Sequence, residues 1–434
     1  MLDLKITPQR NALLKGFDNE FHALLQVNAV DYEGPEKRSK TLNLAIVIDR
    51  SGSMSGQPLE EAKRSAIMMI EQMNVSDRVA VVAYDNEAEL IVPSMLCMEK
   101  ATIIAGVRSI REGGVTALHA GWLMGAEEVA RQKTQNSLNR VLLLSDGNAN
   151  QGLSDIDDIK SQCAQLADAG VTTSTYGLGH QFNEVLMIGM AASGLGQGYY
   201  GETAEDLADP FREEFELLLN TVANNLRLKV DAPGFVEFKL LNNFRQNQDG
   251  WSMPDIAAGG EGWALFKLKI NQKDIGEKPL EVLLCEICFK DRLGNNQKTD
   301  PVKLILEPLS PNAFEAVSED KKVKSRISEI LVATFQRQAR EAAQRGDWER
   351  VERIIAEAKL AASDDLWMKE SLQSLEKYSR RRQTMQFSKE ALYSADRMGK
   401  RLVARDELSA SYSADIESQK AAYLRRKTER GKRM

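Results

Sequence analysis

Apolar and polar residues follow two different periods along this chain. Within the first 30 residues, apolar side chains fall at every second position, as in "LDLKIT" and in "FHALLQVNA". This alternation predicts β-strands with one buried face. From residue 42 onward the pattern changes to near-continuous apolar runs, such as "LNLAIVID" and "NRVLLLSDG". Runs of this kind are typical of strands that are buried on both faces of a parallel sheet.

Segments with helical spacing alternate with these apolar runs. Leu59, Ala62 and Ala66, for example, mark one face of a helix that follows the first run. Strands that alternate with helices predict a doubly wound, Rossmann-like α/β domain with a mostly parallel sheet. We place this domain at residues 42–224 and expect its last helix at residues 205–224.

Beyond this domain the period of two returns in "GFVEFKLL", "GWALFKLKI" and "LEVLLCEICFKD". Such strands, separated by turns rich in Gly and Asn, indicate a β-sandwich. The N-terminal strands have no other sheet to join. We therefore predict that residues 1–36 and 225–308 form one β-sandwich and that the α/β domain is inserted into it.

The C-terminal part of the sequence predicts helices. Residues 312–382 are periodic, and they fit either a plain helical bundle or a single tetratricopeptide-like (TPR-like) hairpin. Residues 383–434 are weakly periodic and of mixed charge, and we expect a basic tail there that is partly helical or disordered. Residues 380–434 hold 15 Lys and Arg against 7 Asp and Glu, although the whole chain has a net charge of −6. Such a tail is either a solvated terminus or a contact with an anionic surface, for example nucleic acid or membrane phosphate.

Composition and motifs limit the cellular location and the kinds of catalysis that we expect of this protein. No apolar run approaches the roughly 20 residues of a membrane-spanning helix, and the N-terminus lacks a signal-peptide pattern, so we expect a cytoplasmic protein. The three histidines lie in no Ser/His/Asp or HExxH arrangement, and the four cysteines complete no zinc set. No phosphate-binding G-x-x-x-x-G-K-[ST] loop is present. We therefore do not expect an enzyme, and a Mg²⁺-dependent hydrolase is the minor alternative.

Oxygen-bearing side chains gather where the predicted strands end. In "IVIDRSGSMSG" a buried strand ends at a carboxylate, and hydroxyls follow at alternate positions, which point the same way in an extended loop. Loops at the carboxyl ends of parallel strands converge. Five such side chains come from three loops: Asp49, Ser51, Ser53, Thr116 and Asp146. Carboxylates and hydroxyls suit Mg²⁺, with Mn²⁺ or Ca²⁺ as substitutes. The alternative is a set of capping turns that bind nothing.

Three motifs within the α/β domain carry a family resemblance. "DRSGS", "GGVTAL" and "LLSDGNANQG" resemble, in order, the motifs of a von Willebrand factor type A (VWA) domain with a metal-ion-dependent adhesion site (MIDAS). The resemblance implies that the same five side chains hold Mg²⁺, with one coordination position left for an Asp or Glu of a partner protein. Four further residues near this site are candidates for partner contacts: Arg50, Ser55, Asn148 and Asn150.

The resemblance also implies a class of function. It favours a bacterial, non-enzymatic protein-binding module or scaffold. The alternative is an accessory subunit of a MoxR-type AAA+ ATPase or of a kinase/phosphatase stress-response system.

Overall fold

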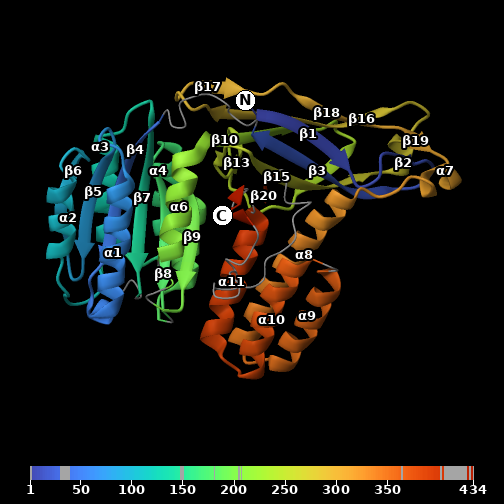
Figure 1. Cartoon of the computed structure of the whole chain (residues 1–434). Helices are drawn as coiled ribbons and strands as arrows, with labels where there is room; N and C mark the ends of the chain where they lie inside the picture. Colours follow the sequence, from blue (N-terminus) through green and yellow to red (C-terminus); the bar gives the residue numbers. More distant parts are fainter. Residues whose placement is uncertain are drawn as a thin grey trace.

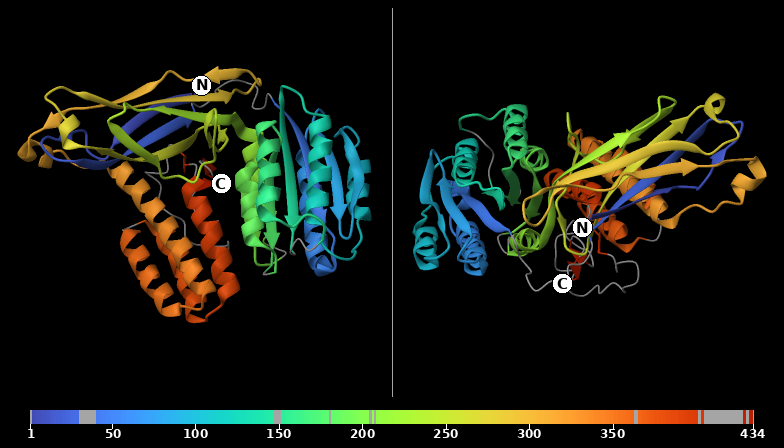
Figure 2. Two further views of the ribbon diagram at one scale, coloured as in Figure 1. Left: turned by 180° about the vertical axis from the view of Figure 1, so that it is seen from behind. Right: turned by 90° about the horizontal axis from the view of Figure 1, so that it is seen from above.

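The computed structural model describes residues 2–29, 40–146, 151–179, 181–203, 206, 208–362, 365–400, 403–404, 428–429 and 432–433. The chain forms an α/β domain, a β-sandwich and a bundle of helices (Figure 1). In the view from above, the α/β domain and the sandwich lie beside one another and meet at a junction (Figure 2).

A six-stranded sheet forms the centre of the α/β domain, in the order β6-β5-β4-β7-β8-β9. Its strands are β4 (Thr41–Asp49), β5 (Arg78–Tyr84), β6 (Ala88–Leu96), β7 (Ser137–Ser145), β8 (Thr172–Leu178) and β9 (Leu195–Gly201). All neighbours are parallel except β5 and β6, which form an antiparallel hairpin. Every residue of β7, and every residue of β4 after the first, is buried, which explains their near-continuous apolar sequence.

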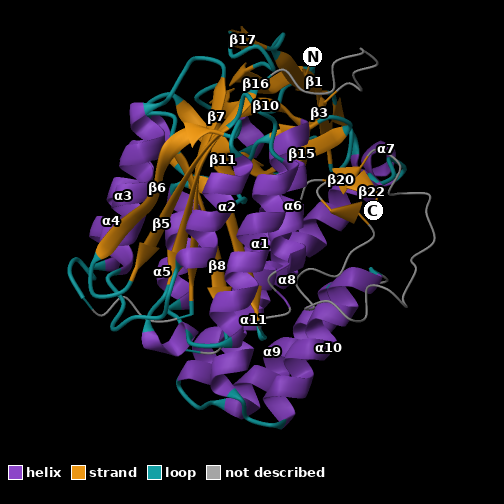
Figure 3. Cartoon of the chain, turned by 60° about the vertical axis from the view of Figure 1, so that its left-hand side comes forward, coloured by secondary structure: helices purple, strands orange, loops and turns teal. Residues whose placement is uncertain are grey.

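Helices cover both faces of this sheet (Figure 3). One face carries α1 (Gln57–Gln72), α2 (Lys100–Ser109) and α6 (Ala208–Asn220), and the other carries α3 (Leu118–Arg131), α4 (Ile156–Asp168) and α5 (Glu184–Ser193). Helix α3 approaches the sheet closely, because a Cβ added at Gly125 would lie 2.5 Å from Cγ2 of Val47. The predicted doubly wound α/β fold is confirmed.

Two antiparallel sheets make up the sandwich. The first has the order β1-β3-β15-β11 and the second β12-β13-β10-β16-β17, with β14 and β18 attached to it. The strands are β1 (Leu2–Pro8), β3 (Asn19–Ala29), β10 (Thr221–Asp231), β11 (Val236–Leu240), β12 (Gln246–Asn247), β13 (Gly250–Met253), β14 (Ile256–Ala257), β15 (Gly260–Ile270), β16 (Leu280–Lys290), β17 (Asn296–Lys298) and β18 (Val302–Leu306). A short parallel pair, β2 (Leu13–Leu14) and β19 (Pro308–Leu309), lies apart.

The N-terminal strands and the later strands share one sheet. Strand β3 pairs with β15 along nearly its whole length, from Asn19 opposite Ile270 to Asn28 opposite Glu261. The two sheets bury one common core, which includes Leu25, Leu226 and Ala264. The α/β domain is therefore inserted into the sandwich, as the sequence predicted.

The last helix of the α/β domain is shorter than predicted. We expected it at residues 205–224, but α6 ends at Asn220 and β10 begins at Thr221. The helix ends there because Leu226 and Leu228 alternate into the sandwich core, so the chain must already be extended. Strand β10 follows α6 directly, without an intervening loop.

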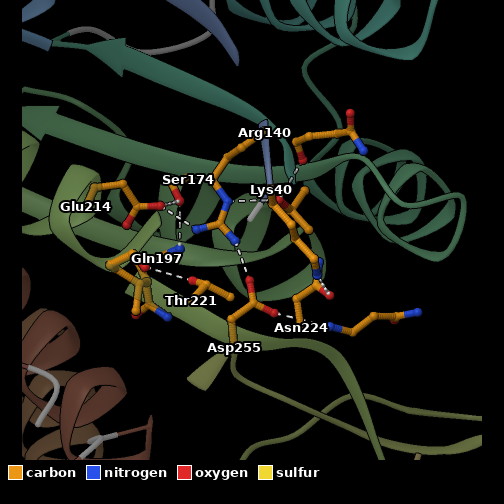
Figure 4. Close-up of polar contacts among 12 residues, drawn as sticks. Lys40, Arg140, Ser174, Gln197, Glu214, Thr221, Asn224 and Asp255 are labelled. Atoms are coloured by element: carbon orange, nitrogen blue, oxygen red, sulfur yellow. Dashed lines mark hydrogen bonds and ion pairs between the residues drawn. The ribbon is translucent and has the colours of Figure 1, made fainter. Parts of the chain in front are cut away.

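A buried network of charges crosses the junction (Figure 4). Arg140 of β7 donates to Glu214 of α6 at 2.5 Å and to Asp255 of the sandwich at 2.8 Å. Glu214 also accepts hydrogen bonds from Ser174 at 2.7 Å and from Tyr199 at 2.8 Å. The network joins the central sheet, the last helix and the sandwich.

The helical domain consists of α7 (Pro311–Glu315), α8 (Lys321–Gln344), α9 (Trp348–Ala361), α10 (Leu366–Arg380) and α11 (Thr384–Lys400). The last helix agrees with the helical part of our expectation for residues 383–434, but it corrects the boundary of the tail, because residues 384–400 belong to the bundle. Phe387, Ala391 and Ala395 are fully buried at a spacing of four, and this short apolar stripe was masked by the charged residues around it. Lys389 of α11 donates to the carbonyl of Phe182 at 2.7 Å, so this helix also contacts the α/β domain.

Of the remaining tail, the structure describes only three short strands. Strand β20 (Val403–Ala404) pairs with β15, and β21 (Thr428–Glu429) pairs with β22 (Lys432–Arg433). The expected contact with an anionic surface falls mainly on residues outside the described ones and stays a prediction. Among the described residues, no helix combines the length and the apolar character that crossing a membrane requires.

Candidate metal centre at the carboxyl edge of the sheet

The carboxyl ends of the central strands, which carry the candidate ligands, lie at the edge of the sheet that faces away from the sandwich; Figure 1 shows the arrangement of the strands and the sandwich. The opposite edge meets the sandwich, because Lys40, just before β4, donates to Asn224 of β10 at 2.8 Å. Strands β4 and β7 are adjacent and parallel. Asp49, the last residue of β4, and Asp146, which follows β7, are therefore brought to the same edge.

Asp49 anchors the site. Its carboxylate is fully buried, and it accepts hydrogen bonds from the backbone N–H of Ser51 at 2.9 Å and from the hydroxyl of Ser145 at 2.7 Å. Burial raises the pKa of this carboxyl above its ordinary value, although these hydrogen bonds oppose the rise. Ser145 was not among the predicted site residues, because within β7 it resembles any other buried strand position.

The two serine hydroxyls connect Asp49 to the second carboxylate. Ser51 Oγ lies 3.3 Å from Ser53 Oγ, and Ser53 donates to Asp146 Oδ1 at 2.7 Å. Burial raises the pKa of Asp146 to about 6; the charge of Asp49 adds to this rise, whereas the hydrogen bond from Ser53 opposes it. Four of the five predicted ligands thus form one hydrogen-bonded chain.

Thr116 comes from a third loop, which is fixed to the first by backbone hydrogen bonds. Gly113 N–H donates to the carbonyl of Arg50 at 2.7 Å, and Gly52 N–H donates to the carbonyl of Gly114 at 2.8 Å. Thr116 follows two residues later and is only 4% exposed. The structure therefore places the three predicted loops side by side.

A fourth loop, after β5, supports this arrangement and was not predicted to belong to the site. Asp85 Oδ2 accepts from Gly114 N–H at 3.3 Å, and Asn86 Oδ1 accepts from Val115 N–H at 2.7 Å. The fit is close: a Cβ added at Gly113 would lie 1.8 Å from Asp85 Oδ2. The signal in the sequence is the pair Asp-Asn at the end of a buried strand, which by itself indicates only a turn.

The structure describes two of the four candidate partner-binding residues, Arg50 and Ser55. The Arg50 guanidinium donates to Glu89 at 2.6 Å and to Asp85 at 3.4 Å. Burial alone would raise the pKa of Asp85, but backbone hydrogen bonds from Glu87 and Gly114 and the charge of Arg50 hold it below its ordinary value. Ser55 is exposed on the same loop. Asn148 and Asn150 lie outside the described residues.

This arrangement fits a hard divalent cation. Two neighbouring carboxylates with raised pKa values indicate a place where negative charge is costly, and a cation would offset that cost. Oxygen donors alone suit Mg²⁺. Among the described residues, no group of three or more His, Cys, Asp or Glu comes together as a metal site. Hydroxyls would therefore supply much of the coordination, and we expect modest affinity.

Comparison with known proteins identifies the domain. Residues 43–212 match the family model of the von Willebrand factor type A domain. The chain contains a VWA domain. Uncharacterized protein YfbK of Escherichia coli (strain K12) is 28% identical over 264 residues, which cover 58% of this chain and 46% of YfbK. Uncharacterized protein sll0103 of Synechocystis sp. is 30% identical over 198 residues, which cover 45% of this chain and 46% of that protein.

A solved structure extends the similarity beyond the VWA domain. The von Willebrand factor type A protein from Catenulispora acidiphila superposes with a TM-score of 0.67 at 18% identity, covering 86% of this chain and 89% of that one. At this identity the likeness concerns the fold alone. The chain spans about half the length of the curated relatives that it matches. VWA domains commonly bind a divalent metal and act in protein interactions.

Proposed function

We propose that the VWA domain binds a divalent cation, Mg²⁺ first of all, and through it an acidic side chain of a partner protein. The proposed ligands are Asp49, Ser51, Ser53, Thr116 and Asp146. The bound ion would offer an open coordination position to a carboxylate oxygen of Asp or Glu. The observation that carries this proposal is the hydrogen-bonded chain from Asp49 through Ser51 and Ser53 to Asp146.

The residues around the ligands have a supporting part in this proposal. Ser145 holds the Asp49 carboxylate in place, and Asp85 and Asn86 hold the loop that carries Thr116. Arg50 lies beside the metal loop, where its guanidinium is fixed by two carboxylates. We propose that it helps to select the partner, together with the exposed Ser55.

A binding module is favoured over an enzyme. His22 contacts Gln9 at 3.2 Å and His119 contacts Gln162 at 2.8 Å, so neither imidazole is set up as a base for the serine hydroxyls. His180 lies outside the described residues. Turnover of p-nitrophenyl phosphate with Mg²⁺ that is lost in Asp49→Ala would contradict this part of the proposal. Association with an AAA+ ATPase stays a prediction, which the experiment below also tests.

The decisive experiment joins metal binding to partner binding. Isothermal titration calorimetry of the full chain with MgCl₂ measures the ion directly. The immobilised chain is then incubated with a lysate of the source cells, in Mg²⁺ or in EDTA, and retained proteins are identified by mass spectrometry. We expect proteins that are retained only with Mg²⁺.

Two aspartate variants of equal charge make the comparison specific. Asp146→Ala removes a proposed ligand, whereas Asp158→Ala removes an exposed carboxylate from α4. We expect Asp146→Ala to lose both the Mg²⁺ heat and the retained proteins, and Asp158→Ala to keep both. Equal Mg²⁺ binding by the two variants, or retention that EDTA does not change, would overturn the proposal.

A further inference from the structure

A cavity of about 200 Å³ lies at the junction of the VWA domain and the sandwich, at the sheet edge opposite the metal centre. The VWA domain contributes the turn before β7 and the first residues of that strand, and the sandwich contributes residues of β10, β16 and the segment before β15. The volume is below the roughly 300–1,000 Å³ that is typical of drug-sized ligands. Its size therefore suits a small ligand.

Positive charge predominates in the lining. Four cationic side chains and one carboxylate line the cavity: Lys40, Lys133, Arg140, Lys290 and Asp255. The guanidinium of Arg140 is balanced by Asp255 and by the buried Glu214. Arg140 carries one charge and its two partners carry two, so one negative charge is left against the three lysines, and Asp291 acts on Lys40 as a further anion. A small net positive charge therefore remains at the wall of a partly closed space.

Lys40 is the most notable of these lysines. It is only 6% exposed, and its ammonium group donates to the neutral amide oxygen of Asn224 at 2.8 Å (Figure 4). Burial lowers the pKa of Lys40 to about 8, although Asp255 and Asp291 act in the opposite direction. The Asp291 carboxylate is already engaged, since it accepts hydrogen bonds from the backbone of Leu293 and Asn295.

An acceptor in the same lining lacks a partner. Asn225 follows Asn224 on β10, and its side-chain oxygen Oδ1 is buried without a hydrogen-bond partner. Buried polar atoms of this kind are usually satisfied by protein, water or a ligand. A ligand that accepts hydrogen bonds from lysines and also donates one to Asn225 would satisfy both features.

We propose that this junction cavity is a binding site for a small phosphate group, held by Lys40 and Lys290 and capped by Asn225. Monohydrogen phosphate carries both the acceptor oxygens and the single hydroxyl that the lining requires. Because residues of both domains line the cavity, the bound anion would hold the VWA domain and the sandwich in one relative orientation.

Thermal unfolding of the full chain tests the site. Sodium phosphate is compared with sodium chloride at equal ionic strength, and glycerol 3-phosphate is a third arm that distinguishes free phosphate from a small phosphomonoester. We expect a rise in Tm of several degrees with at least one of the two phosphates. Titration calorimetry should give a Kd for that compound that rises at least tenfold in Lys40→Gln and in Lys290→Gln.

Control variants separate a site from a general salt effect. Phosphate stabilises folded proteins non-specifically by exclusion from their surface, and this effect should be equal in all variants. Lys278→Gln removes the same charge from an exposed loop of the sandwich and should keep the full response. Equal phosphate shifts in Lys40→Gln, Lys290→Gln, Lys278→Gln and the unaltered chain would overturn the proposal. If Lys40→Gln failed to fold, Lys290→Gln alone would decide the question.

Discussion

Glu214 offers a strong test of the charge network at the domain junction. Its side chain is fully buried, and it accepts hydrogen bonds from Arg140, Ser174 and Tyr199. In Glu214→Ala, Arg140 keeps Asp255, but it loses one of two buried anions. Breaking a buried ion pair costs about 3–5 kcal/mol. Since Asp255 remains as a partner of Arg140, we place the loss in unfolding free energy from the broken ion pair at about 3 kcal/mol. The hydroxyls of Ser174 and Tyr199 also lose their acceptor, which brings the total loss to about 4 kcal/mol.

Glu214→Gln separates the charge from the hydrogen bonds. The amide oxygen can still accept from Arg140 and Ser174, and the amide nitrogen can donate to Tyr199. Only the negative charge is lost, so we expect destabilisation of about 1–2 kcal/mol, the difference between charged and neutral hydrogen bonds. Glu216→Ala, at an exposed position of the same helix, should change stability by about 0.5 kcal/mol or less.

Urea unfolding of the full chain, followed by circular dichroism, measures these differences from the midpoint at unchanged slope m. The order of stability should be the unaltered chain and Glu216→Ala first, then Glu214→Gln, then Glu214→Ala. A loss below about 1 kcal/mol in Glu214→Ala would refute the reasoning that the network is held by a buried charge. Equal losses in the Gln and Ala variants would also refute it.

Three further predictions concern the metal centre and the junction. Mg²⁺ at about ten times its Kd should stabilise the unaltered chain by about 1.4 kcal/mol in thermal unfolding, and it should not stabilise Asp49→Ala or Asp146→Ala. Equal stabilisation of all three proteins by Mg²⁺ would contradict the ligand assignment. Gly113→Ala should abolish the Mg²⁺ shift, because its Cβ would meet the Asp85 carboxylate at 1.8 Å; an unchanged calorimetric Kd for Mg²⁺ would argue against a tight loop. Lys40→Met should stabilise the chain by about 2 kcal/mol at pH 7. The pKa of Lys40 is lowered from 10.5 to about 8, so its burial costs about 3 kcal/mol of stability, and losing its hydrogen bond to Asn224 reduces the gain by about 1 kcal/mol. The unfolded state binds more protons between these two pKa values, so the stability of the unaltered chain should rise from pH 8 to 10.5, and urea titrations of Lys40→Met should lack that rise.

The sequence revealed the strands more reliably than the ends of the helices. Buried parallel strands such as β4 leave an unmistakable apolar run, and a carboxylate at the end of that run can be placed at a sheet edge from topology alone. The C-terminal end of α6 was harder to predict from the sequence. Helical and extended conformations compete over residues 221–224, and the sandwich core that decides between them is built by distant segments.

The supporting residues of the candidate site were hidden for a related reason. Ser145 and Asp85 act through hydrogen bonds to other loops, and their own sequence neighbourhoods read as an ordinary strand and an ordinary turn. Helix α11 was assigned to the tail because most of its residues are charged or small, and its apolar stripe becomes recognisable only against α8. Contacts between segments far apart in the chain were therefore the part that local patterns did not contain.

The pairing of β3 with β15 also governs the order in which the protein can fold during its synthesis. Asn19 lies opposite Ile270, so 251 residues of chain must leave the ribosome before the first sheet of the sandwich is complete. At roughly 5–20 residues per second this takes roughly 12–50 s. Throughout that interval the hairpin of β1 and β3 carries an uncovered apolar face, including Leu25 and Val27. The VWA domain has all its strands once residue 201 has been made, before β15 is available. The nascent chain thus passes through a stage in which every strand of its inserted domain has been made while its host sheet still lacks β15, and the exposed apolar face of the hairpin is then the kind of surface that promotes aggregation and that chaperones cover.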